Sequence, residues 1–157
     1  MKEQIKYEDF LLEVSPDLIG FVNEMNDFLL NNDCKIEIKS AKNGYVVSYS
    51  YNKKVILNYV FRKSGMLIRI YADNISKYTD FLETLPDSMF KEIEKASVCK
   101  RLIDPAKCNL RCPMGLDFTL KGTHYQKCRY GLMFKMNIES TPFIRTFVEN
   151  EVKERNA

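Results

Sequence analysis

The sequence contains a single histidine, His124, and none of the common catalytic signatures. It has no Walker loop, no G-x-G-x-x-G segment, no H-E-x-x-H segment and no G-x-S-x-G elbow. One imidazole limits histidine-based general acid–base catalysis, although carboxylates remain available for that role. These absences favour a non-enzymatic binding or interaction module over an enzyme.

Long apolar stretches are also missing. No run approaches the ~20 apolar residues that a membrane-spanning helix needs. The first nine residues contain no apolar segment of the kind found in a signal peptide. We therefore expect a cytoplasmic protein without membrane contact. The chain of 157 residues, 45% hydrophobic and 29% charged, fits one globular domain spanning residues 1–157.

Charge is unevenly distributed, although the net charge is only +3. Residues 1–33 carry eight acidic side chains against two lysines, whereas residues 99–136 carry eight basic side chains against two aspartates. The simplest interpretation is that solvated faces of opposite sign offset each other. The basic stretch nevertheless leaves open a negatively charged partner.

Hydrophobic periodicity divides the first half of the chain into helices and then strands. Apolar residues recur with helical spacing over 7–14 and again over 16–31, where Ser15 and Pro16 mark the second helix start. The period then changes to two over 34–72. Turn residues interrupt that pattern three times, which predicts a four-stranded antiparallel meander.

The second half predicts two more helices, two strands and a final helix. The helices cover about 78–85 and 89–96, the strands 116–121 and 130–136, and the last helix begins at Thr141. Separate runs of helices and strands indicate an α+β fold. We expect a mainly antiparallel sheet, formed by the meander plus a C-terminal hairpin, with helices packed on one face. All six strands could belong to one sheet.

The segment from Cys99 to Met136 holds four of the five cysteines and the histidine. In a reducing compartment such residues indicate thiol or metal chemistry more than disulfides. The pairs Cys108–Cys112 and His124–Cys128 suggest a zinc site, since structural zinc takes four thiolate or imidazole ligands in a tetrahedron.

Strand spacing favours a different ligand set. If residues 124–136 form a strand, His124 and Cys128 lie ~13 Å apart, too far for one ion. We therefore predict that zinc, if bound, is held by Cys99, Cys108, Cys112 and Cys128, with His124 as an alternative ligand. Zinc is the only cofactor that the sequence suggests.

Two other interpretations of the cysteines stay open. Free cysteines are commonly small buried hydrophobes, and Cys34 aligns with the apolar residues Ile36 and Ile38. A reactive thiol at Cys128, as in a thiol-dependent enzyme, is the other. Flanking cations would favour a thiolate there, but neighbouring strand residues point to opposite faces.

Partners are predicted only by class: a small molecule, a protein or a nucleic acid. A nucleic-acid surface would use the basic side chains of the 99–135 stretch: Lys100, Arg101, Lys107, Arg111, Lys127 and Arg129. Tyrosines on adjacent predicted strands, such as Tyr49 and Tyr59, would either stack on bases or pack beneath the helices. The packed arrangement is the simpler one.

The last third of the chain resembles a group of small bacterial proteins. The likeness rests on Asp104–Cys108 and on Lys127–Phe134, which reads K-C-R-Y-G-L-M-F. It implies a Cys-rich loop, a strand carrying the K-C-R-Y motif and a closing helix, but no activity. In its order of elements the chain is also similar to the YjbR-like α+β proteins, and fold alone does not define function.

Overall fold

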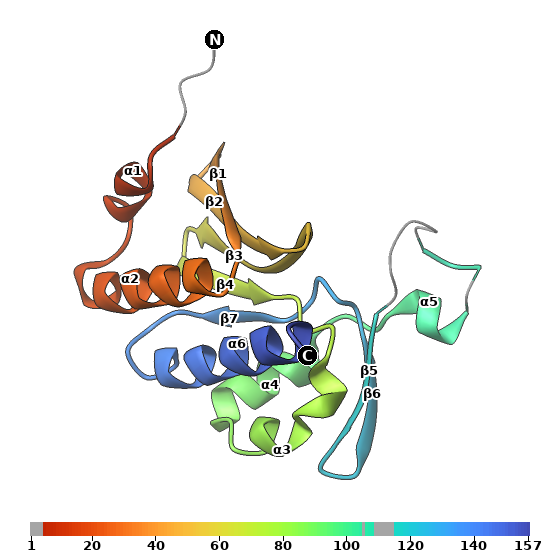
Figure 1. Cartoon of the computed structure of the whole chain (residues 1–157). Coiled ribbons are helices and arrows are strands. Elements are labelled where there is room, and N and C mark those ends of the chain that lie inside the picture. The colour runs from red at the N-terminus through yellow and green to blue at the C-terminus, as the bar shows by residue number, and fades with distance from the viewer. Residues whose placement is uncertain (1–4, 105, 109–114) are drawn as a thin grey trace.

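The computed structural model describes residues 5–104, 106–108 and 115–157. A five-stranded antiparallel sheet, in the order β1-β2-β3-β4-β7, forms the centre, and β5 and β6 form a separate hairpin (Figure 1). The α+β prediction is therefore confirmed. The strands are β1 Lys35–Ala41, β2 Gly44–Tyr51, β3 Lys54–Arg62, β4 Gly65–Ile70, β5 Leu116–Leu120, β6 Thr123–Lys127 and β7 Met133–Lys135. The helices are α1 Tyr7–Leu11, α2 Pro16–Asn31, η1 Ile75–Lys77, α3 Thr79–Leu82, α4 Asp87–Lys95, α5 Lys100–Ile103 and α6 Thr141–Arg155.

The predicted meander corresponds to strands β1 to β4, which pair consecutively and antiparallel. Tight turns join them at the predicted positions. Between β2 and β3, Asn52 and Lys53 both adopt left-handed backbone angles, with φ of 49° and 67°. Asparagine is one of the few residues other than glycine that enters this region readily.

One face of the sheet packs against helices α2 and α6. The Tyr49 hydroxyl donates a 2.8 Å hydrogen bond to Asn26 Oδ1 of α2, and the Phe134 ring of β7 lies 5.9 Å from that of Phe147 in α6. Tyr49 and Tyr59 are fully buried. For these two tyrosines the packed arrangement is confirmed, so they form no stacking platform.

The C-terminal hairpin differs from the prediction. The segment 116–121 was expected to pair with 130–136, but β5 pairs with β6, and β7 joins the main sheet beside β4. The chain bends between β6 and β7, where the Gly131 amide donates a 2.9 Å hydrogen bond to the Cys128 carbonyl. Periodicity missed this bend because Cys128, Tyr130, Leu132 and Phe134 alternate without interruption in the sequence. In the structure the buried positions change phase, from Lys127 and Arg129 before the bend to Leu132 and Phe134 after it.

The β5–β6 hairpin is attached to the helical side of the molecule. Leu116, Phe118 and Leu120 are buried, and β5 contacts η1 and α3. The short helix α5 lies in a segment for which no regular structure was predicted. Within the described residues, no helix has the length and apolar character required to cross a membrane.

Candidate functional site

The candidate site is built on a short extension of the β5–β6 hairpin. Val98 forms an antiparallel bridge with Lys127. The Cys99 amide donates to the Gln126 carbonyl at 2.8 Å, and the Cys128 amide donates to the Ser97 carbonyl at 2.7 Å. Because residues two apart along a strand share a face, this pairing puts the side chains of Cys99 and Cys128 on the same face.

A pocket of about 400 Å³, here called the thiol pocket, opens on that face. Three cysteines of the Cys99–Met136 segment line it: Cys99 is buried, Cys128 half-buried and Cys108 exposed. All three are free thiols. The described residues that line the pocket are Ser97, Val98, Cys99, Lys100, Arg101, Cys108, Gly115, Cys128, Arg129 and Tyr130.

Close packing between two segments shapes the floor of the thiol pocket. A Cβ atom placed on Gly115 would lie 2.5 Å from the Cys99 Sγ atom and 2.7 Å from the Lys127 carbonyl oxygen. Real Cβ atoms do not approach other atoms so closely, so the position accepts no side chain without a shift of the backbone. Glycine is required here by the close contact with Cys99 and the Lys127 backbone.

The wall of the thiol pocket is held by Arg129. Its guanidinium makes two hydrogen bonds to Asp73, from Nε to Oδ1 at 3.1 Å and from Nη2 to Oδ2 at 2.9 Å. It also lies over the rings of Tyr71 and Tyr130, at 5.0 and 5.5 Å from their centroids. Such a two-pronged contact fixes orientation as well as charge. Arg129 therefore positions the bend that carries Cys128 and Tyr130.

Asp73 connects this wall to a buried charge network. Arg155 Nη2 donates to the same carboxylate at 3.2 Å, and its Nε donates to Glu151 Oε2 at 2.8 Å. Glu151 is fully buried and also accepts a 2.6 Å bond from the Tyr78 hydroxyl. Burial and the adjacent Glu151 carboxylate raise the pKa of Tyr78 well above its usual value. Helix α6 is thus connected to the thiol pocket by Arg155, which shares the Asp73 carboxylate with Arg129.

Lys127 has a structural role at the end of helix α4. Its ammonium group donates hydrogen bonds to the carbonyls of Glu94 and Ala96, at 2.8 and 2.9 Å. Glu94 lies in the last turn of α4 and Ala96 is its C-cap residue, and a cation is favourable at this end of a helix. Lys127 is buried and fastens the hairpin to that helix.

The basic residues predicted to bind nucleic acid therefore fall into a buried and an exposed group. Lys127 and Arg129 are buried with their charged groups bound inside the protein, so they do not face solvent as phosphate contacts would. Lys100 and Lys107 are exposed, and Arg101 is half-buried. Arg111 lies outside the described residues.

The other predicted ligands lie apart from the thiol pocket. His124 is on the exposed side of the β5–β6 hairpin, where its Nε2 atom lies 2.6 Å from Asp117 Oδ1. Cys34 is buried beside the main sheet, and burial raises its pKa to about 11. Cys112 falls outside the described residues. Among the residues that are described, no three histidine, cysteine or acidic side chains converge closely enough to hold a metal ion.

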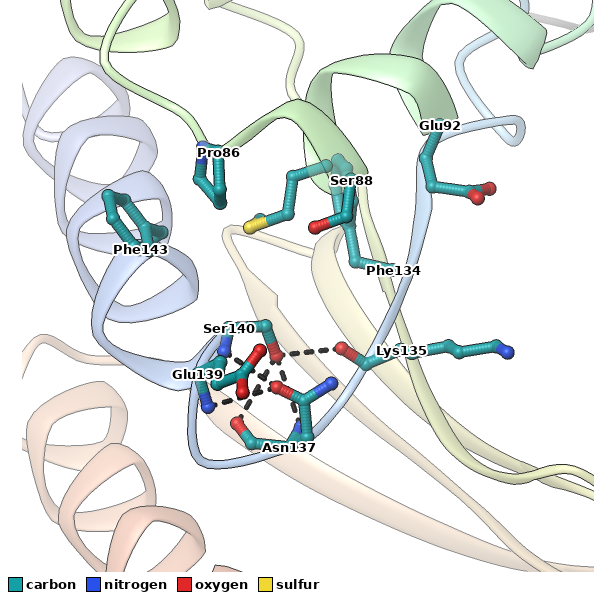
Figure 2. Close-up of a pocket in the computed structure, with 10 residues that line it drawn as sticks. Pro86, Ser88, Glu92, Phe134, Lys135, Asn137, Glu139, Ser140 and Phe143 are labelled. Carbon is teal, nitrogen blue, oxygen red and sulfur yellow. Dashed lines mark hydrogen bonds between the residues drawn. The ribbon is translucent and has the colours of Figure 1, made fainter.

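A second pocket, of about 380 Å³, lies between α4, β7 and the start of α6 (Figure 2). Asn137 and Ser140 in its lining form hydrogen bonds within the turn that precedes α6. Asn137 Oδ1 accepts from the amides of Glu139 and Ser140 at 3.0 and 2.8 Å, and Ser140 Oγ donates to the Lys135 carbonyl at 2.7 Å. Figure 2 shows the Lys135 side chain directed away from this cluster. These bonds stabilise the turn before α6, so the thiol pocket is the stronger candidate.

The sequence did not predict the residues that position the wall and the cysteines of the thiol pocket but contribute no thiol themselves. Asp73, Tyr71 and Gly115 stand far from the cysteines in sequence or lack any motif, and only tertiary contacts reveal their roles. Tyr130 was expected on the strand face with Leu132, but it lies in the bend and is 46% exposed. It therefore contributes an accessible aromatic ring to the pocket.

Comparison of the chain with protein families, with curated proteins and with solved structures found no match. The likeness to small Cys-rich bacterial proteins and to YjbR-like proteins stays a prediction. Function is therefore inferred from the pocket itself.

Proposed function

We propose that the chain is a non-enzymatic binding module and that its thiol pocket binds a zinc ion through Cys99, Cys108 and Cys128. The observation that carries the proposal is that these three free thiols, from separate parts of the sequence, line one pocket. The sequence-based ligand set adds Cys112 as the fourth thiolate. Thiolates are among the ligands that structural zinc prefers, and binding zinc to them involves no redox change.

The electrostatics of the pocket support the same occupant. A zinc ion with three or four thiolates carries net negative charge, and Lys100 and Arg101 line the pocket to offset it. No carboxylate or imidazole is among the described lining residues, which agrees better with a thiolate site than with a mixed one. That composition also offers no general base to a thiol enzyme.

Metal binding would have to draw the thiols together. Zinc–sulfur bonds are ~2.3 Å long, so the sulfur atoms must approach to about 4 Å of one another. The exposed Cys108 has the most freedom to move, whereas Cys99 is fixed by Gly115 and by its strand pairing. We therefore infer that zinc binding is coupled to ordering of the pocket, as in many small metal sites.

The test is metal content combined with a count of reactive thiols in the full-length protein. One zinc per chain, and thiols protected from alkylation until a chelator is added, are the expected results. Cys99→Ser and Cys128→Ser should each lower zinc affinity by at least ~10-fold. Cys34→Ala is the matched control, because Cys34 is a buried thiol outside the pocket and its loss should leave zinc binding unchanged.

Cobalt(II) offers a second, spectroscopic readout. Bound cobalt should show the intense near-ultraviolet band of metal–thiolate bonds, and this band should disappear in Cys128→Ser but persist in Cys34→Ala. Protein that purifies without zinc from zinc-supplemented cells, and that gives no thiolate band with cobalt, would refute the proposal.

An organic anion is the second candidate occupant. Val98 and Tyr130 are 51% and 46% exposed at the pocket, and Lys100 supplies a solvent-facing cation beside them. Apolar walls with a few polar groups are typical of small-molecule sites, and 400 Å³ falls within their usual range. The probe is 8-anilinonaphthalene-1-sulfonate. Its fluorescence on the metal-free protein should weaken in Lys100→Gln but not in Lys91→Gln, an exposed control on α4.

A further inference from the structure

We propose that the free edge of strand β1 pairs with the same edge of a second copy of this chain, giving a two-fold dimer with a continuous ten-stranded sheet. The proposal is independent of the thiol pocket. Among the described strands β1 pairs only with β2, so its other side presents unpaired backbone N–H and C=O groups. An open strand edge of this kind is a ready template for another strand.

A groove lined by both apolar and charged residues accompanies this edge. Ile36 and Ile38 are half-buried on the helix-covered face, opposite the buried Tyr49 and Val47 of β2. They line a groove whose other wall is formed by residues 5–8 at and just before the start of α1, where the apolar Ile5 and Tyr7 alternate with the charged Lys6 and Glu8. The groove is about 560 Å³. A strand added to β1 would cover these side chains.

The charges on the opposite face of β1 specify which strand fits. Lys35, Glu37 and Lys39 are all exposed and alternate in sign along the strand. Glu37 and Lys39 form a weak ion pair within the strand at 3.3 Å, with side chains 66% and 71% exposed, so both are free to exchange partners. An edge of lysines alone would repel its own copy, but this alternating edge is self-complementary in one register.

That register follows from symmetry. When Ile38 lies on the two-fold axis, an antiparallel pair brings Glu37 of each copy opposite Lys39 of the other. The pairing then runs over the whole of β1. At each end of the paired region, Lys35 of one copy lies opposite Ala41 of the other. Placing Glu37 on the axis instead would bring Lys35 opposite Lys39, which repels. The charge pattern therefore selects the register centred on Ile38.

The two-fold axis also determines how the helix-covered faces of the two sheets are oriented. A two-fold axis perpendicular to the sheet leaves the helices of both copies on the same side, so Ile38 meets its own equivalent beside the groove. The interface is isologous and closed, and it does not propagate into a filament. Because it joins one strand per copy, we expect a weak, concentration-dependent dimer.

The test is sedimentation equilibrium of the full chain over a wide concentration range, with charge-swap variants. Glu37→Lys and Lys39→Glu each place like charges opposite one another twice and should weaken dimerisation by about tenfold or more. The double variant, Glu37→Lys with Lys39→Glu, restores opposite charges and should restore the dimer. Lys91→Glu, an exposed change on α4, should leave the dissociation constant unchanged.

Amide hydrogen exchange provides a measurement that does not depend on any variant. Amides within 36–40 should become more protected as protein concentration rises. A wild-type chain that stays monomeric at every concentration would overturn the proposal. So would a dimer that Glu37→Lys and the double variant affect equally, since the contact would then lie elsewhere.

Discussion

Replacing Glu151 with glutamine should strongly destabilise the fold, although the two side chains have nearly the same shape. Glu151 is fully buried, and both of its carboxylate oxygens accept two hydrogen bonds. Oε1 accepts from the Asn74 amide at 3.0 Å and the Tyr78 hydroxyl at 2.6 Å. Oε2 accepts from Asn74 Nδ2 at 2.9 Å and Arg155 Nε at 2.8 Å.

Glutamine changes one of these oxygens into an NH₂ group that faces two donors. With the NH₂ group at the Oε2 position, the hydrogen bonds from Asn74 Nδ2 and Arg155 are both lost. At the Oε1 position it can donate to the Tyr78 hydroxyl, so only the bond from the Asn74 amide is lost. In either orientation Arg155 loses one of its two charged partners. Hydrogen bonds to charged groups contribute ~1.5–3 kcal/mol each, and removing one partner of a buried pair costs ~3–5 kcal/mol. We expect a loss of about 3–5 kcal/mol, a large part of the ~5–15 kcal/mol that stabilises a typical domain.

The assay is denaturant unfolding at neutral pH, with Glu154→Gln as the matched control. Glu154 lies on the same helix, is partly exposed and pairs with Lys77 only at 3.9 Å. Its replacement should cost less than ~1 kcal/mol. If Glu151→Gln unfolds at the same denaturant concentration as Glu154→Gln, the buried network does not stabilise α6, and our account of how the pocket wall is supported fails.

Two further predictions concern packing and pH. Gly115→Ala should displace either Cys99 or the Lys127 backbone and cost ~1–3 kcal/mol in unfolding experiments, whereas a stability equal to wild type would mean that this close contact is absent in solution. Stability should also fall in alkali, because burial raises the pKa of Cys34 from 9.0 to about 11 and that of Tyr7 from 10.0 to about 12. These groups ionise earlier in the unfolded chain, so their contribution is complete below pH 9 and is lost as the pH rises toward 11 and 12. Denaturation midpoints that stay constant from pH 8 to about 11 would contradict this reasoning.

Local patterns were sufficient for most of the fold. Helix α2 begins at Pro16 and ends at Asn31, as its capping residues and periodicity predict. The meander was predictable because residues two apart along a strand share a face and tight turns have distinctive residues. The second hairpin was not, because Cys128, Tyr130, Leu132 and Phe134 alternate in the sequence as if they formed one strand, whereas the chain bends at Gly131 and the buried positions change phase there. Periodicity records which residues face inward but not which strand each one pairs with.

For the candidate site, less could be predicted from the sequence than for the fold. The sequence by itself determined that the cysteines and basic residues are concentrated between Cys99 and Met136, and strand spacing argued against pairing His124 with Cys128 in one metal site. It did not determine which groups meet, because that depends on contacts between residues distant in sequence. Only the tertiary structure brought Cys99, Cys108 and Cys128 to one pocket and bound the charges of Lys127 and Arg129 inside the protein. A charge in the sequence is free to bind a partner only if the fold leaves it unpaired, and pairing is decided in three dimensions.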